Sequence, residues 1–248
     1  MNRILFEKEE ISGGVATFGG VRAEHVLKVL HGEVGQVLKT GELNGPIGTG
    51  EITAIENGLV TVRLTHDAEA LAPWVDLILA PPRPRVMKRL LPQLASLGVG
   101  RIVLVGAKKV EKDFWGATLL KEEIYRPLLI DGLMQAGTTA LPTISTVRNF
   151  RKWLRDDLDR EFPSARRIVA HPYGANSAPD LGSPSGRLIL AVGPEGGWTD
   201  EEVALLEEKG FVRYSLGPRI LRTDTAVIAL LAQLQKTADT PLTVGTNI

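Results

Sequence analysis

The chain has 248 residues, 44% of them apolar, and its 29 Lys and Arg balance its 29 Asp and Glu. This composition is typical of a folded protein of one or two domains and excludes a disordered, collagen-like or coiled-coil chain. The absence of cysteine excludes disulfides, Cys-liganded zinc, iron–sulfur clusters and thiolate catalysis, and four scattered histidines argue against a metal site. No apolar run approaches the ~18 residues of a membrane span, so we expect a cytoplasmic protein.

The first 70 residues alternate short β-rich runs with Gly and Asn turns, which predicts a small β-barrel domain at 1–72. Its strands are expected at Ile4–Phe6, Val15–Phe18, Gln36–Lys39, Gly50–Ile55 and Leu59–Leu64. One helix is expected at Val21–Leu30, with an apolar side made of Val26, Leu27, Val29 and Leu30. Barrels of this size often bind RNA, but a structural or dimer-supporting barrel explains the pattern equally well.

From Trp74 the pattern changes to alternating strands and helices, which predicts an α/β domain at 73–240 and a flexible tail at 241–248. Strands are expected at Val75–Ala80, Arg101–Val105, Ile168–Ala170, Arg187–Val192 and Val212–Leu216. Helices are expected at Arg85–Leu97, Leu119–Ala136 with an interruption at Pro127, Phe150–Leu158, Asp200–Lys209 and Thr223–Thr237. The segment Gly174–Gly186, rich in Pro, Ser and Gly, is expected to be a loop.

Charge is distributed unevenly along the chain. Residues 1–72 carry six basic side chains and ten acidic ones, a net of −4, which leaves about +4 for the remainder. Within that remainder, residues 81–112 hold eight Lys and Arg and one acid, and we call this segment the basic patch. Helical spacing of the apolar residues puts three of the cations on the polar face, namely Arg85, Lys88 and Arg89. The patch suits RNA phosphate, although a solvated helix face explains it equally well.

Two turns between a strand and a helix stand out, and the first is Gly193–Glu202. Gly196 and Gly197 are expected to permit positive φ angles and a close approach of a ligand to the backbone. Thr199, followed three residues later by Glu202, predicts a capping box at the start of the next helix. Such a turn is a ligand cradle by geometry, but it is also a common tight turn. The dinucleotide and P-loop fingerprints are absent from it.

The second turn is Leu216–Ala226, which places two arginines, a carboxylate and two threonines at the end of a strand. Open α/β sheets place their binding sites at such strand ends. Local capping by Thr223 and Asp224 is the simpler explanation. Capping leaves Arg219 and Arg222, which follow the Gly-Pro turn, without a role.

At these two turns the chain resembles the bacterial 16S ribosomal RNA uracil-N3 methyltransferases of the SPOUT superfamily. The resemblance covers nearly the whole chain, weakly in the first part, where Arg3 and His25–Leu30 match, and strongly after residue 185. It implies an α/β fold with a PUA-like N-terminal barrel and a deep trefoil knot in the C-terminal domain. It also implies S-adenosylmethionine (SAM) as methyl donor, 16S rRNA, naked or within the small subunit, as partner, and a homodimer.

The resemblance also implies roles for individual residues, with no metal. Binding of SAM is expected from His171, Gly193, Pro194, Glu195, Gly196, Gly197, Leu216, Gly217, Pro218, Ile220, Leu221 and Thr223. RNA binding is expected from Arg3, Arg22, Arg83, Arg85, Lys88, Arg89 and Gln135. For catalysis, Arg222 or Arg219 would stabilise the uracil imide anion, and Asp224 or a water would accept the N3 proton.

Several positions depart from the family pattern. Ser96 stands where glutamate is usual, Thr138 and His31 stand where arginine is usual, and Asp224 replaces glutamate. These changes bear more on the RNA target than on the methyl donor. Two alternatives therefore stay open, a SPOUT methyltransferase that acts on another RNA and a non-catalytic RNA-binding assembly protein. The intact Gly-rich turn argues against the non-catalytic protein.

Overall fold

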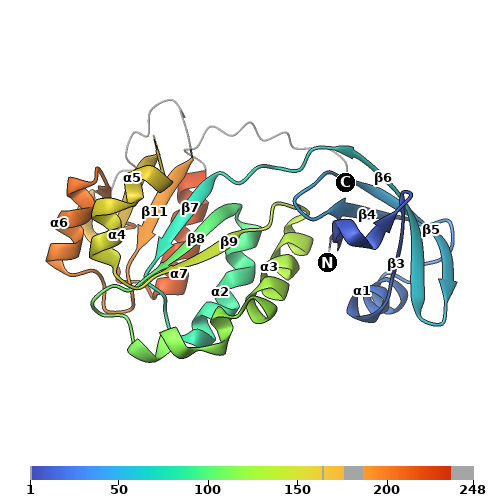
Figure 1. Cartoon of the computed structure of the whole chain (residues 1–248), viewed down its shortest axis with the longest axis horizontal. Helices are drawn as coiled ribbons and strands as arrows, with labels where there is room; N and C mark the ends of the chain where they lie inside the picture. The colour runs from blue at the N-terminus through green and yellow to red at the C-terminus, as the bar shows by residue number, and fades with distance from the viewer. Residues whose placement is uncertain (1, 164, 176–186, 236–248) are drawn as a thin grey trace.

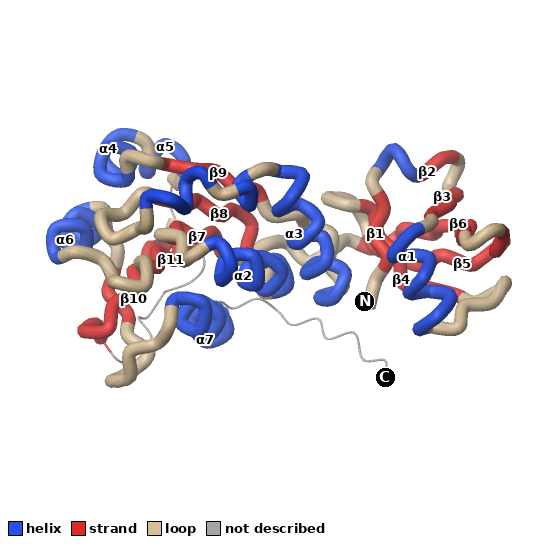
Figure 2. The backbone as a smooth tube through the Cα atoms, turned by 90° about the horizontal axis from the view of Figure 1, so that it is seen from below, coloured by secondary structure: helices blue, strands red, loops and turns tan. Residues whose placement is uncertain are grey.

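The computed structural model describes residues 2–163, 165–175 and 187–235 and folds them around two six-stranded sheets (Figure 1). Residues 4–68 build one sheet and residues 75–214 build the other. The two parts lie side by side along the long axis of the molecule (Figure 2). Three sequence predictions fall wholly or partly outside the described residues: the tail at 241–248, most of the loop at Gly174–Gly186, and the last two residues of the helix at Thr223–Thr237.

The first sheet is curled and mixed, with the order β1-β4-β5-β6-β3-β2; β1 runs parallel to β4 and the other pairs are antiparallel. Its strands are β1 (Ile4–Phe6), β2 (Ile11–Ser12), β3 (Val15–Phe18), β4 (Val37–Glu42), β5 (Ile47–Glu56) and β6 (Leu59–Ala68). A short 3-10 helix, Lys8–Glu10, precedes β2. The five predicted strands are confirmed, and β4, β5 and β6 extend further than predicted. Phe6 and Phe18 meet edge to face in the core, 5.4 Å apart.

The helix predicted at Val21–Leu30 is an α-helix for only part of its length. Helix α1 (Gly20–Glu24) passes into a π-helical turn over His25–Val29, and the N–H of Leu30 donates to the carbonyl of His25 at 3.1 Å. A wider turn rotates the residues that follow it. Val26 is therefore fully buried, whereas Val29 is 61% exposed. The predicted apolar side is wrong for Val29 and Leu30.

The second sheet is parallel throughout and has the order β12-β10-β11-β7-β8-β9. Its strands are β7 (Val75–Leu79), β8 (Val99–Val105), β9 (Thr143–Val147), β10 (Arg166–Ala175), β11 (Leu188–Val192) and β12 (Val212–Tyr214). The helices are α2 (Pro84–Ser96), α3 (Glu122–Ala136), α4 (Phe150–Asp156), α5 (Leu158–Glu161), α6 (Asp200–Glu208) and α7 (Thr223–Gln235), with 3-10 turns at Lys112–Gly116 and Thr118–Leu120. The α/β architecture is confirmed, although the sequence analysis missed β9.

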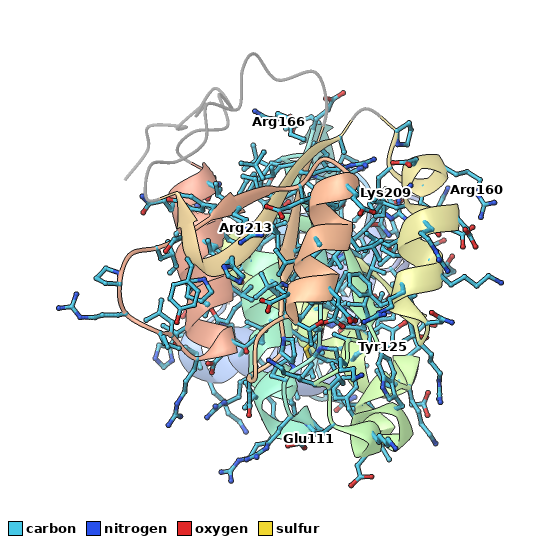
Figure 3. The ribbon with its side chains drawn as sticks, turned by 90° about the vertical axis from the view of Figure 1, so that its left-hand side faces the viewer. Glu111, Tyr125, Arg160, Arg166, Lys209 and Arg213 are labelled. Atoms are coloured by element: carbon cyan, nitrogen blue, oxygen red, sulfur yellow. The ribbon has the colours of Figure 1, made fainter. Side chains whose placement is uncertain are left out.

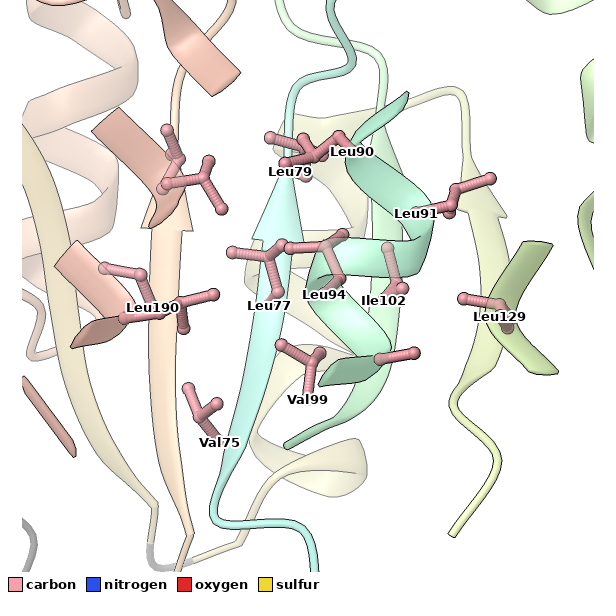
Figure 4. Close-up of a cluster of buried hydrophobic side chains, with 14 of the residues drawn as sticks. Val75, Leu77, Leu79, Leu90, Leu91, Leu94, Val99, Ile102, Leu129 and Leu190 are labelled. Carbon is pink, nitrogen blue, oxygen red and sulfur yellow. The ribbon is translucent and has the colours of Figure 1, made fainter. Parts of the chain in front are cut away.

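Helices cover both faces of this sheet, with α2, α3 and α7 on one face and α4, α5 and α6 on the other (Figure 2). Leucines of α2 pack on the central strands, among them Leu90 and Leu94 against Leu77 and Ile102 (Figure 4). Each such side chain contributes about 1.5–3 kcal/mol through burial. Both β7 and β11 are buried along their whole length; β11 reads as a continuous apolar run, whereas in β7 the run is interrupted by Asp76, which pairs with Arg187 at 2.9 Å.

The predicted interruption of α3 at Pro127 is wrong, because the helix is continuous from Glu122 to Ala136. Pro127 lies in the second turn and is exposed. The hydrogen bond that it cannot make would end on the carbonyl of Glu123 at the surface, where water can replace it.

Hydrogen bonds join the first sheet to the end of α3. The backbone N–H groups of Asn2 and Arg3 both donate to the carbonyl of Met134, at 3.0 and 3.1 Å. The guanidinium of Arg3 donates to the carbonyl of Gly137 at 2.9 Å and to two carbonyls of β4 and β5. Arg126 of α3 donates two hydrogen bonds to the carboxylate of Glu7. These contacts tie the two parts together at one end of the parallel sheet.

Candidate active site

A cavity of about 440 Å³ opens where β10, β11 and β12 end, at the carboxyl edge of the parallel sheet. Ligands of open α/β sheets bind at this edge. Eleven of the twelve residues expected to bind SAM line the cavity, and Pro218 is the exception. The structure thus brings the two turns of the sequence analysis together. Binding by these residues stays a prediction.

The turn after β11 is tightly held. The N–H of Gly197 donates to the carbonyl of Pro194 at 2.8 Å, and Gly197 has a φ of +69°. Gly196, which was expected to permit a positive φ, does not adopt one. Instead, Lys109 covers it: the Nζ of Lys109 donates to the carbonyl of Gly196 at 2.7 Å, and a Cβ at position 196 would lie 3.0 Å from the Lys109 stem.

The capping box predicted at the start of α6 is confirmed. The hydroxyl of Thr199 accepts from the N–H of Glu202, and the Glu202 carboxylate accepts from the N–H of Thr199 at 2.9 Å. Glu202 is only 2% exposed. Its other oxygen accepts from the N–H of Lys108 at 2.7 Å. One buried carboxylate therefore anchors the turn after β11 to the loop after β8.

The turn after β12 has fewer anchors. Ser215 is buried, and its hydroxyl donates to the carbonyl of Pro172 and accepts from the N–H of Gly217. Gly217 has a φ of +111°, and a side chain there would meet no protein atom within 4 Å. Beyond it, Ile220 is 83% exposed. Arg219 is exposed as well and lines the cavity.

The other two residues expected in catalysis lie outside the cavity wall. Arg222 is exposed, and its carbonyl accepts from the N–H of Ala226 as α7 begins. Asp224 lies 3.7 Å from Arg89 of α2. Helix α7 starts at Thr223, so Thr223 is its first residue rather than its cap. The catalytic roles of Arg219, Arg222 and Asp224 stay predictions.

The sequence analysis missed several residues of the cavity wall. These include Lys109, Tyr173, Trp198, Tyr214 and Ser215. Trp198 stacks on Phe150, with the rings 5.2 Å apart, and so fixes the end of the turn after β11. A position just after a strand was the available signal for Lys109, which the sequence analysis counted only as part of the basic patch. Burial lowers the pKa of His171, which also lines the cavity, and nearby Arg213 adds to the shift.

A second, smaller cavity of about 200 Å³ adjoins the first, where β7, β8 and β11 end. The two cavities share a wall made of Lys109, Pro194, Glu195 and Gly196. The remaining wall of the small cavity comprises Pro81, Pro82, Arg83, Glu111 and Phe114.

The Nε of Arg83 donates to Glu111 at 3.0 Å and lies 3.9 Å from the carboxylate of Glu195. The Glu111 hydrogen bond raises the pKa of Arg83. Glu111 itself projects from the surface (Figure 3).

The residues expected to bind RNA fall into two groups. Arg83, Arg85, Lys88 and Arg89 are all exposed on or beside α2. Arg3 and Arg22, in contrast, are half-buried. Arg22 forms an ion pair with Glu10 at 2.5 Å and lies over the rings of Phe6 and Phe18. Gln135 is exposed at the end of α3. RNA binding by both groups stays a prediction.

Two departures from the family pattern have structural roles. The hydroxyl of Ser96 donates to the carbonyl of Gly132 at 2.8 Å and joins α2 to α3. Thr138 donates to the carbonyl of Leu71 in the segment between the two sheets. His31 adopts a positive φ of 49°. Within the described ranges, no group of three or more His, Asp or Glu could hold a metal ion, and no helix there is long and apolar enough to span a membrane.

The parallel sheet, with its cavity at the strand ends, defines an α/β protein of the nucleotide-binding kind. A family model described as an RNA methyltransferase domain matches residues 70–235. The chain belongs to this family of RNA methyltransferases.

Relatives of known name match over most of the chain. The ribosomal RNA small subunit methyltransferase E of Treponema pallidum is 35% identical over 94% of this chain and 90% of its own. A solved structure of the same-named protein from Neisseria gonorrhoeae, bound to S-adenosyl methionine, superimposes with a TM-score of 0.76 at 25% identity and covers 96% of this chain and 98% of its own. A methyltransferase from Legionella pneumophila, in complex with SAM, gives a TM-score of 0.75 at 26% identity, with coverages of 96% and 98%.

Proposed function

We propose that this chain is a SAM-dependent methyltransferase that methylates N3 of a uridine in 16S ribosomal RNA. The observation that carries the proposal is the 440 Å³ cavity between two Gly-rich strand-end turns, in a chain 35% identical to a small subunit rRNA methyltransferase. An RNA-modifying enzyme acts in the cytoplasm, where ribosomes are assembled. Substrate recognition would combine the basic patch with the first sheet.

The cavity suits SAM in size and in the chemistry of its wall. Leu216, Ile220 and Leu230 supply apolar surface for an adenine ring, and the glycines at 197 and 217 carry no side chain that would keep a ligand from the backbone. When bound, SAM supplies an electrophilic methyl group on a sulfonium. The protein must therefore align the acceptor nitrogen and remove its proton. Arg219, at the cavity wall, and Arg222 would stabilise the charge that develops on the uracil oxygens.

We also infer the finer architecture that family membership implies. The boundary between domains falls near residue 72, the curled first sheet is a PUA-like barrel, and the parallel domain holds a trefoil knot. Residues of β10 and of the turns after β11 and β12 line one cavity, which is compatible with a knotted path. The exposed apolar residues Ile220 and Ile228 support a homodimer.

The function is tested by two measurements. Calorimetry should detect SAM binding by the purified protein, and a scaffold without turnover would give no methylated RNA in the same preparation. Mass spectrometry of rRNA nucleosides from a deletion strain should show the loss of one N3-methyluridine from 16S rRNA. Loss of a methylated nucleoside from another RNA instead would assign a different target.

A further inference from the structure

We propose that the small cavity receives the target uracil and that Glu195 is the catalytic residue that accepts its N3 proton. This inference rests on the proposed function, and it assigns the proton to a residue that the sequence analysis placed only in the cofactor site. The grounds are the position of the small cavity, the chemistry of its wall and the placement of Glu195 between the two cavities.

The order of the strands sets the position of the small cavity. In the order β12-β10-β11-β7-β8-β9, the large cavity lies over the ends of β12, β10 and β11, and the small one over the ends of β11, β7 and β8. The turn after β11 is therefore the partition between them. A methyl acceptor must lie next to the methyl donor. The small cavity is the neighbouring space that shares this partition.

The wall of the small cavity suits one flat ring. Its volume, about 200 Å³, is below the ~300–1,000 Å³ of sites for larger ligands. Pro81, Pro82 and Phe114, which are all buried, form the apolar part of the wall. The exposed arginines of α2 begin directly beyond this wall. A single base, turned out from an RNA whose phosphates contact α2, would fit this arrangement.

Glu195 has the chemistry and the place that proton removal requires. It lines both cavities, whereas Asp224 lines neither. Its side chain is 48% exposed, and its one ion pair among the described residues, with Arg83 at 3.9 Å, is long enough to leave the carboxylate able to accept a new hydrogen bond. Asp224 lies in the first turn of α7 and is paired with Arg89 at 3.7 Å.

The step balances without a further reactant. The N3 proton passes to a carboxylate oxygen of Glu195 as the N3 lone pair bonds to the methyl carbon. The carbon–sulfur bond breaks, the sulfur keeps its electron pair and becomes a neutral thioether, and Glu195 releases the proton to water. The neighbouring Lys109, whose ammonium is 2.7 Å from the carbonyl of Gly196, fixes the backbone that carries Glu195.

The test compares Glu195→Gln with the wild type in single-turnover methylation, at saturating SAM and a saturating RNA fragment. Loss of a general base should lower the rate by ~10²-fold or more. The same RNA with 5-fluorouridine at the target has a more acidic N3–H, which needs the base less. With this substrate, the ratio of the wild-type rate to the Glu195→Gln rate should be at least tenfold smaller than with uridine. A misfolded or misaligned site would not give this effect.

Two further variants and one binding measurement complete the test. Glu201→Gln is the matched control: Glu201 is an exposed carboxylate paired with Arg151, lies six residues further on and lines neither cavity, so it should keep the wild-type rate. Asp224→Asn should not show rescue by 5-fluorouridine. Calorimetric SAM affinity of Glu195→Gln should stay within about threefold of wild type.

Several results would overturn the inference. A wild-type single-turnover rate for Glu195→Gln would do so. A lowered rate in Asp224→Asn that the 5-fluorouridine substrate restores would do so as well, because it would assign the base to Asp224. A tenfold loss of SAM affinity with a full rate at saturating SAM would make Glu195 a cofactor-binding group only. If the wild type itself produced no N3-methyluridine, the proposed function would fall as well, so the wild-type product is identified first.

Discussion

The turns after β11 and β12 line the same cavity, but the protein holds them in opposite ways. The turn after β11 is fixed by the buried Glu202, by the Lys109 contact to Gly196 and by the stacked ring of Trp198. The turn after β12 is anchored chiefly through the hydroxyl of Ser215, and beyond it Ile220 and Arg222 are exposed. One wall of the site is held by contacts within the protein, and the other presents exposed side chains.

This difference bears on how binding energy is used. A wall that is already ordered loses little conformational entropy when a ligand arrives, whereas a sparsely anchored wall must be ordered at that moment. Substitutions of the groups that anchor the turn after β11 should therefore act on stability first. Substitutions in the turn after β12 should act on binding and rate, with small effects on stability.

The largest expected effect is on the anchored turn. Glu202→Ala removes a buried carboxylate that accepts from the N–H groups of Thr199 and Lys108 and leaves both donors without a partner. The free energy of unfolding should fall by about 3 kcal/mol or more, as measured in urea. Glu201→Ala, an exposed neighbour, should change it by less than about 0.5 kcal/mol. A loss below 1 kcal/mol for Glu202→Ala would mean that this anchor is dispensable.

The second-largest effect is expected on the methylation rate, from a substitution just beyond the turn after β12. Arg222→Lys keeps the charge but loses the planar fork of donors, so single-turnover methylation should fall by ~10²-fold, with unfolding unchanged. Arg155→Lys, an exposed arginine of α4, is the control and should retain the wild-type rate. If saturating RNA restored the rate of Arg222→Lys, Arg222 would position the RNA rather than stabilise the transition state.

A third prediction isolates the backbone of the turn after β12. Gly217→Ala forces a residue with a Cβ to adopt a φ of +111°, so the turn should shift and SAM affinity should fall about tenfold. Gly210→Ala provides a matched control, because Gly210 has a φ of +79°, equally free space and a place outside the cavity. Both variants should lose about 1 kcal/mol of stability, but only Gly217→Ala should weaken binding measured by calorimetry. Equal SAM affinities for Gly217→Ala and Gly210→Ala would show that the turn after β12 accommodates the added methyl group without a change in binding.

The two turns also show which features of the site could be predicted from the sequence. Glycines, the Thr199 capping box and the strand before each turn follow local rules, so the sequence predicted both turns and the helix starts near them. The covering of Gly196 by Lys109 joins residues 87 positions apart, and local patterns carry no such information. The sequence indicated only that glycine permits a positive φ at 196 and 197, and of the two only Gly197 adopts one.

Elsewhere, too, elements were missed because local sequence patterns do not report features that arise only in the folded chain. Strand β9 is an edge strand with mostly exposed or half-buried residues, so it lacks the apolar run by which β11 was predicted. The π-helical turn after α1 changed the face that Val29 presents, and helical periodicity assumes a constant turn. The small cavity was not predicted at all, because three separate loops meet only in the folded sheet.

The smallest expected effect is the pH dependence that arises from His171, which lies between the two turns in the cavity wall. Burial lowers the pKa of His171 in the folded protein, whereas the unfolded chain takes up the proton near the usual value of about 6.5. Below that pH the unfolded state binds more protons, so stability falls as the pH drops through about 6.5 and stops falling below the folded-state pKa. His171→Gln should remove this contribution, and the difference in urea midpoint between wild type and variant should shrink from about pH 7.5 to pH 5.5. Burial lowers the pKa of His66 in the first sheet as well, but that residue is present in both proteins and its contribution cancels. A difference in midpoint that stayed constant over this range would mean that His171 titrates alike in the folded and unfolded states.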